Sequence, residues 1–154
     1  MADKLIIEIF REKNAEEFTK ALAAPDSRLE TGSAAAMTAA VAMSLAARAA
    51  AACDQSGEKA QYIARNIETL RGYMVHLIDE DVKSRGPLRR AIKEGDARTI
   101  EAARQPAVCI DQEIINMMGQ ALELIAGLTE ICPKDSMHYV GEAAELALAA
   151  VRCA

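Results

Sequence analysis

The feature that most constrains the fold is an alanine-dense stretch at residues 34–53, in which twelve of the twenty residues are Ala. Ala is the strongest helix former, and Thr38 and Val41 are the only β-branched residues in the stretch, so it predicts a helix. Because small side chains let neighbouring backbones come close, we expect this helix to be the central, most buried one of a bundle. Ser44 and especially Arg48 would be costly in a bilayer, so we expect no membrane span.

The length and charge of the chain exclude several classes of protein. With 154 residues it fits one domain, residues 1–154, and can bury a core without disulfide or metal staples. The formal net charge is −5 and the Lys and Arg residues are scattered along the sequence, which disfavours a nucleic-acid partner, because phosphate binding needs a concentrated basic face. The few aromatic residues offer no stacking platform for single-stranded nucleic acid.

The cysteines and histidines indicate neither disulfides nor a metal site. No signal-peptide pattern opens the chain. Its four cysteines are widely spaced without a CxxC pair: Cys53, Cys109, Cys132 and Cys153. We expect them to be reduced, mostly buried as small hydrophobic residues, in a cytoplasmic protein. His76 and His138 lie far apart in the sequence and in no ligand-spaced cluster, so we expect no metal.

The remaining segments are typical of amphipathic helices separated by turns. Within residues 1–24 we expect helical structure, with Asn14 as the N-cap of a helix at 15–23, followed by a loop at 24–30. Further helices are expected at 58–84, where Gly86-Pro87 ends the helix, and at 87–104, with an interruption at 94–96 where Asp96 can cap a new helix. Two more are expected from Pro106 to about 131 and from Asp135 or Ser136 to about 151. The predicted fold class is all-α: an antiparallel bundle of about five helices without strands.

The residues in front of the alanine-rich helix form a candidate ligand-binding lip. Thr31 or Ser33 is the expected N-cap, and Gly32 gives freedom for a sharp entry. A helix N-terminus attracts carboxylates and phosphates through its free amides and the positive end of its dipole. The alternative is that Thr31 and Ser33 cap the helix and do nothing else.

Asp81 is the most informative single residue. It continues an apolar series that steps by four and three residues along one helix face: Ile63, Ile67, Leu70, Met74 and Leu77. A carboxylate on an inward stripe must be paired or face a cavity, because an unpaired buried charge is expensive. The alternative is a solvated acidic face formed by Asp79, Glu80 and Asp81 near the end of the helix.

Four stretches together resemble the cyclodeaminase/cyclohydrolase family. They are Leu22-Ala23-Ala24-Pro25, Thr31-Gly32-Ser33-Ala34-Ala35-Ala36-Met37, Asp79-Glu80-Asp81-Val82 and Gly141-Glu142-Ala143-Ala144. Their order and spacing agree with the family pattern over most of the chain. The chain differs in carrying Glu30 and Thr31 where the family usually has consecutive glycines.

The resemblance implies an all-helical homodimer that acts on tetrahydrofolate one-carbon units, either as a methenyltetrahydrofolate cyclohydrolase or as a formiminotetrahydrofolate cyclodeaminase. A tetrahydrofolate derivative would be the substrate, with no metal. Asp81 would then be the catalytic acid or base. The residues that would bind the substrate are Thr31, Gly32, Ser33, Asp79 and His138.

The sequence leaves three functions open: the folate enzyme, a family member that binds another small ligand, and a non-catalytic helical dimer that serves as an interaction module. The apolar surface of the chain is a second reason to expect a homodimer. The alanine-rich helix and four methionines together offer more apolar surface than one small bundle can bury. The methionines are Met37, Met43, Met117 and Met118.

Overall fold

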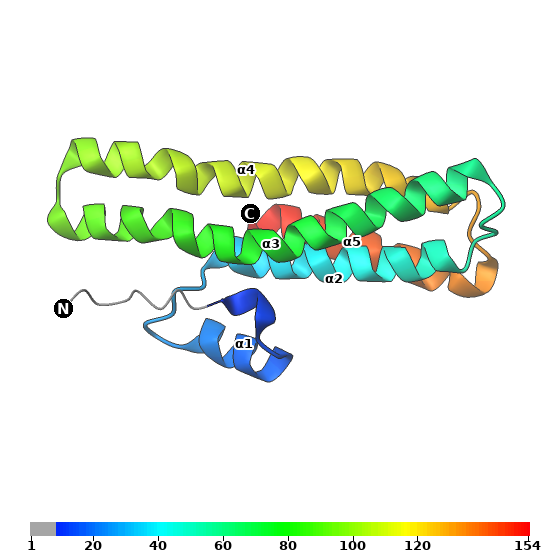
Figure 1. The fold of residues 1–154 in the computed structure, drawn as a ribbon, viewed down its shortest axis with the longest axis horizontal. Coiled ribbons are helices and arrows are strands. Elements are labelled where there is room, and N and C mark those ends of the chain that lie inside the picture. Colours follow the sequence, from blue (N-terminus) through cyan, green and yellow to red (C-terminus); the bar gives the residue numbers. More distant parts are fainter. Residues whose placement is uncertain (1–8) are drawn as a thin grey trace.

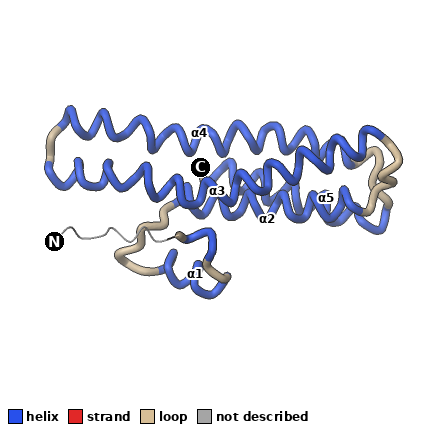
Figure 2. The backbone as a smooth tube through the Cα atoms, in the orientation of Figure 1, coloured by secondary structure: helices blue, strands red, loops and turns tan. Residues whose placement is uncertain are grey.

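The computed structural model describes residues 9–154, so the helical structure expected at 1–8 lies outside the described residues. Figures 1 and 2 show helices joined by short loops, and the described part of the chain contains no strand, which confirms the all-α class. The elements are the 3₁₀ helix η1 (Phe10–Glu12), α1 (Ala15–Ala23), α2 (Thr31–Ala51), α3 (Glu58–Glu94), α4 (Ala97–Leu128), the 3₁₀ helix η2 (Lys134–Ser136) and α5 (Met137–Cys153). Helices α2 to α5 run antiparallel to their neighbours in sequence.

The alanine-rich helix α2 lies at the centre of the bundle, as its composition predicts. It packs against α3 and α5 and, over a smaller area, against α4 (Figure 1). Buried alanines such as Ala39 and Ala46 let these neighbours approach closely. Val41, Ser44 and Arg48 are exposed, so one face of the helix stays open.

By length and composition α2 also passes the criterion for a membrane-crossing helix. Half of its most apolar window is buried inside the bundle, and the core helix of a soluble protein passes the same criterion. The helix therefore gives only weak support for a membrane span.

The predicted end of α3 at Gly86-Pro87 is wrong, because the helix continues to Glu94. Pro87 removes one backbone donor, but packing beyond it keeps the helix intact: Ala91 is 1% exposed. Figure 1 shows α3 and α4 side by side along their whole length, so that they project as a two-helix hairpin beyond α2 and α5. The helix ends at Gly95, whose φ of 76° is the left-handed conformation that suits a C-cap glycine.

Helix α4 begins after Asp96, which accepts a hydrogen bond from the Thr99 amide and confirms the predicted cap. Pro106 lies inside this helix and does not start it. The spacing of apolar residues in this segment predicts an inward series that steps by four and three residues: Ile110, Ile114, Met117, Ala121, Leu124, Leu128 and Ile131. Ile114, Ala121 and Leu128 are buried as predicted, whereas Met118 and Ile125 are buried in place of Met117 and Leu124. The shift follows from the packing of α4 against α3, α5 and α2, which buries a broader face than a two-helix seam.

Two other expectations about apolar residues are only partly confirmed. Met43 and Met118 are fully buried in the core and add no surface for a partner, whereas Met37 and Met117 are half-buried. The cysteines are all free, and Cys53 is buried. The expectation that each is a core residue is wrong for two that lie exposed, Cys109 and Cys153.

Candidate functional site

The start of α2 faces the side chain of Asp81 on α3. The residue that caps the helix is Glu30, not Thr31 or Ser33, and its side chain makes no capping hydrogen bond. The Ser33 amide, third in the helix, instead donates to Asp81 Oδ2 at 2.8 Å. A carboxylate from a neighbouring helix therefore takes the place that a capping side chain normally fills. The anion favoured by this helix N-terminus is the protein's own Asp81.

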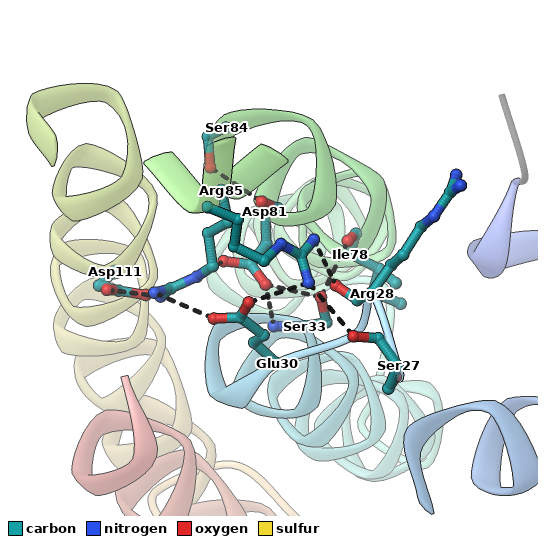
Figure 3. Close-up of polar contacts among 10 residues, drawn as sticks. Ser27, Arg28, Glu30, Ser33, Ile78, Asp81, Ser84, Arg85 and Asp111 are labelled. Atoms are coloured by element: carbon teal, nitrogen blue, oxygen red, sulfur yellow. Dashed lines mark hydrogen bonds and ion pairs between the residues drawn. The ribbon is translucent and has the colours of Figure 1, made fainter. Parts of the chain in front are cut away.

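Asp81 is 0% exposed, and its hydrogen bonds explain how a carboxylate can be buried there. The Ser33 hydroxyl donates to Oδ2 at 2.7 Å, and the Ile78 carbonyl oxygen lies 3.2 Å from the same hydroxyl. Arg85, one turn further along α3, donates from Nε to Oδ1 at 2.6 Å (Figure 3). Both carboxylate oxygens are thus satisfied, and the charge is paired with a guanidinium.

Gly32 makes this close approach possible. A Cβ atom added to Gly32 would lie 2.7 Å from Asp81 Cγ and 2.9 Å from Oδ1 of Asp111, which belongs to α4. These separations are shorter than real Cβ contacts, so a side chain at this position displaces the carboxylates. Glycine is required here for space, because Gly32 is the point where α2 meets two acidic side chains.

Arg85 joins the acidic side chains of three segments. Its Nη2 donates to both oxygens of Asp111 at 2.7 and 2.8 Å, and its Nη1 lies 3.7 Å from Glu30 Oε2. Glu30 also pairs with Arg89 at 3.1 Å (Figure 3). The side chain of Arg85 is 15% exposed, that of Asp111 21% and that of Asp81 0%, so Asp111 is the more accessible carboxyl group.

Burial and neighbouring charges act in opposite directions on this cluster. Burial raises the pKa of Asp111, the guanidinium of Arg85 lowers it, and the negative charge of Asp81 raises it further; the net result is a raised pKa. Burial lowers the pKa of Arg85, but its hydrogen bond to Asp81 and the charges of both carboxylates outweigh this effect and leave that pKa raised. Arg85 therefore stays charged, and Asp111 holds a proton more readily than an exposed Asp.

The predicted site residues are only partly brought together. Gly32 and Ser33 lie against Asp81, and Thr31 is exposed in the first turn of α2. Asp79 lies on another face of α3, where it accepts hydrogen bonds from the backbone amides of Phe10 (2.7 Å) and Arg11 (3.4 Å). Asp79 thus anchors the N-terminal segment and does not join the Asp81 cluster.

His138 also lies outside the cluster. It is exposed in the first turn of α5, beside Tyr139, whose ring packs 4.5 Å from the guanidinium carbon of Arg48. That end of the bundle is the C-terminal end of α2, opposite to Gly32 (Figure 1). Within one chain, the geometry gives no support to the expected role of His138 in substrate binding.

Sequence reasoning missed Arg85 and Asp111. Arg85 stands four residues after Asp81, a spacing that pairs opposite charges on a helix, but the helix was expected to end at Ser84. Asp111 follows the predicted inward residue Ile110, and nothing in its local pattern shows that it faces the start of α2. Among residues 9–154 no group of three or more His, Cys, Asp and Glu side chains is arranged to hold a metal ion.

The fold and this site define an all-helical protein in which a buried carboxylate, held by an arginine, closes the N-terminus of an alanine-rich central helix. The chain belongs to the formiminotransferase-cyclodeaminase family, whose sequence model matches residues 14–154. It is similar in fold to the crystal structure of formiminotetrahydrofolate cyclodeaminase from Thermotoga maritima. The TM-score is 0.85 at 18% sequence identity over 92% of this chain and 74% of that chain. No curated protein matches the sequence.

Proposed function

We propose that the protein binds a tetrahydrofolate derivative and acts on its one-carbon unit, as a methenyltetrahydrofolate cyclohydrolase or a formiminotetrahydrofolate cyclodeaminase. Membership of the family and the similarity in fold to the Thermotoga maritima cyclodeaminase support the class of substrate. The observation that carries the proposal is the meeting of two carboxyl groups, Asp81 and Asp111, with one guanidinium at the start of α2. Carboxyl groups in unlike environments are what general acid–base catalysis needs.

Both reactions require proton transfer beside the one-carbon unit. In hydrolysis a water molecule attacks the methenyl carbon and loses a proton; in deamination the leaving ammonia takes one up. Asp81 is the proposed acid or base, and Arg85 would have to leave Asp81 Oδ1 before that oxygen could accept a proton. Asp111 is a second candidate for the same step, because it is partly exposed and its pKa is raised, chiefly by burial.

A second candidate function is binding of a small ligand without catalysis. The observation that favours it is the burial of Asp81, which is 0% exposed and hydrogen-bonded through both oxygens. Glu30 adds a further carboxylate beside Arg85 at the start of α2, which would repel the carboxylate groups of a folate bound there. In this candidate the Asp81–Arg85 pair stabilises the fold and moves no protons.

The test is an activity measurement with two substrates. Purified protein is mixed with methenyltetrahydrofolate and the loss of its ultraviolet absorbance is followed, and ammonia release is measured with formiminotetrahydrofolate. We expect one of the two rates to exceed the background, and Asp81→Asn to reduce it by about 100-fold or more, the typical contribution of a positioned acid or base. If neither substrate reacts, but folates or other carboxylates raise the melting temperature, the binding function replaces the enzymatic one.

We also propose that the protein is a homodimer. The exposed face of α2 supports this, because Val41 is 45% exposed and is flanked by half-buried Met37 and Leu45. Sedimentation at micromolar concentration should give the mass of two chains, and a monomer would refute the proposal. A cytoplasmic location and the lack of metal, nucleic-acid and membrane partners stay predictions.

A further inference from the structure

A second candidate site lies beside the start of α2. A cleft of about 700 Å³ is formed between the loop that precedes α2 and the second half of α3, from Val82 to Lys93. This volume is in the range of small-molecule binding sites in proteins. The α3 residues that line the cleft lie on both sides of Pro87, so the cleft depends on the continuous helix that the structure reveals.

The side chains around the cleft are predominantly basic. Its lining includes Arg28, Lys83, Arg89, Arg90 and Lys93, against a single acidic residue, Asp26. The whole chain carries a net charge of −5, so this concentration of positive charge is a local feature. The fold therefore brings five of the eighteen Lys and Arg residues together, although they are scattered in the sequence.

Three of these cations have no ion-pair partner among the described residues 9–154. Lys83 pairs with Glu80 at 2.6 Å and Arg89 with Glu30 at 3.1 Å. The other three are Arg28, Arg90 and Lys93. No side-chain hydrogen bond or ion pair joins them to any of the residues 9–154. Figure 3 shows the Arg28 side chain extending away from the cluster around Glu30.

Arg89 holds the two walls of the cleft together. Its guanidinium donates to the backbone carbonyl oxygens of Ser27 at 3.2 Å and Arg28 at 3.3 Å, and so fixes the loop against α3. On α3 itself, Arg89 and Arg90 lie four and three residues before Lys93. Like charges at these spacings weaken a helix by a few tenths of a kcal/mol. Lys93 lies in the last turn of α3, where the helix dipole favours a cation, so this repulsion is partly offset.

We propose that this cleft binds a small polyanion that carries two or more phosphate or carboxylate groups. Arginine side chains bind both groups well because the planar guanidinium can donate two parallel hydrogen bonds. The charges of Arg28, Arg90 and Lys93 would be neutralised by such a ligand, and a cleft lined by charges of one sign concentrates their combined field. The proposal does not rest on the one-carbon chemistry proposed for Asp81.

The test is isothermal titration calorimetry with two probes, inorganic triphosphate and citrate, at constant ionic strength. The variant Arg90→Gln/Lys93→Gln removes two of the unpaired charges. The matched control Arg65→Gln/Lys134→Gln removes the same charge from exposed positions at the opposite end of the bundle. We expect saturable binding to the wild type and to the control, and binding at least about tenfold weaker to the cleft variant, which corresponds to the loss of about 1.4 kcal/mol.

The two probes also identify the chemistry that the cleft recognises. Binding of triphosphate and citrate alike supports recognition of charge, and binding of triphosphate alone supports a phosphate ligand. Chemical shifts of backbone amides should change around residues 26–28 and 82–93 on titration. The proposal is overturned if neither probe binds the wild type, or if the cleft variant and the control lose affinity equally.

Discussion

Replacing Gly32 by Ala tests the geometry of the site through the sign of a stability change. In an ordinary helix position Ala is about 1 kcal/mol more favourable than Gly. At Gly32 the added Cβ would lie 2.7 Å from Asp81 Cγ and 2.9 Å from Asp111 Oδ1, so both side chains must retreat. To reach normal contact they must move by about 1 Å. Such a shift breaks the hydrogen bonds that Ser33 donates to Asp81 at 2.7 and 2.8 Å.

These changes set the expected magnitude. Each hydrogen bond to a charged group contributes about 1.5–3 kcal/mol, so losing both outweighs the gain of about 1 kcal/mol in helix propensity and leaves Gly32→Ala about 2–5 kcal/mol less stable. Urea denaturation followed by circular dichroism measures the difference. Gly119→Ala is the control, because nothing lies within 4 Å of its added Cβ, and it should stabilise the protein by about 0.5–1 kcal/mol. The reasoning is refuted if both variants gain stability.

Three further predictions concern the buried and half-buried carboxyl groups of α3 and α4. Because burial raises the pKa of Asp111 in the folded protein above its ordinary 3.8, the folded state binds more protons, and stability falls as the pH rises above that value. Asp111→Asn should therefore weaken this decline in urea titrations carried out upward from pH 3.8, and an unchanged slope would contradict the assignment. Arg85→Met leaves the buried Asp81 without its cation and should lower the free energy of unfolding by about 3 kcal/mol. Asp79→Ala removes the acceptor of the Phe10 amide and should cost about 1–3 kcal/mol, with faster proteolytic cleavage near residue 10 while ligand binding at α2 is retained.

The sequence predicts those parts of the structure that depend on helical periodicity. The apolar series that ends at Asp81 is buried as expected, because residues four and three apart share one helix face. Asn14 forms the predicted cap of α1 through its side chain and the Glu17 amide. The alanine-rich helix lies at the centre because its small side chains let the neighbouring helices pack closely against it.

Long-range contacts could not be predicted in the same way. The expected helix end at Gly86-Pro87 rests on local preference, and packing of α3 along α4 overrides it. With a helix that ends at Ser84, neither the pairing of Asp81 with Arg85 nor the basic cleft could be expected. The approach of Asp111 to Gly32 depends on how α4 lies against the start of α2, which no local pattern encodes.

The most direct test of the account is the rate at which the protein consumes methenyltetrahydrofolate or formiminotetrahydrofolate, compared between the wild type, Asp81→Asn and Asp111→Asn. Equal circular dichroism spectra should first show that the three proteins are folded. We expect turnover above background by the wild type on one of these substrates, and a loss of about 100-fold or more in Asp81→Asn or Asp111→Asn. Turnover that survives in both variants, or that is absent from the wild type, would contradict the assignment of this carboxylate–arginine cluster as a catalytic site.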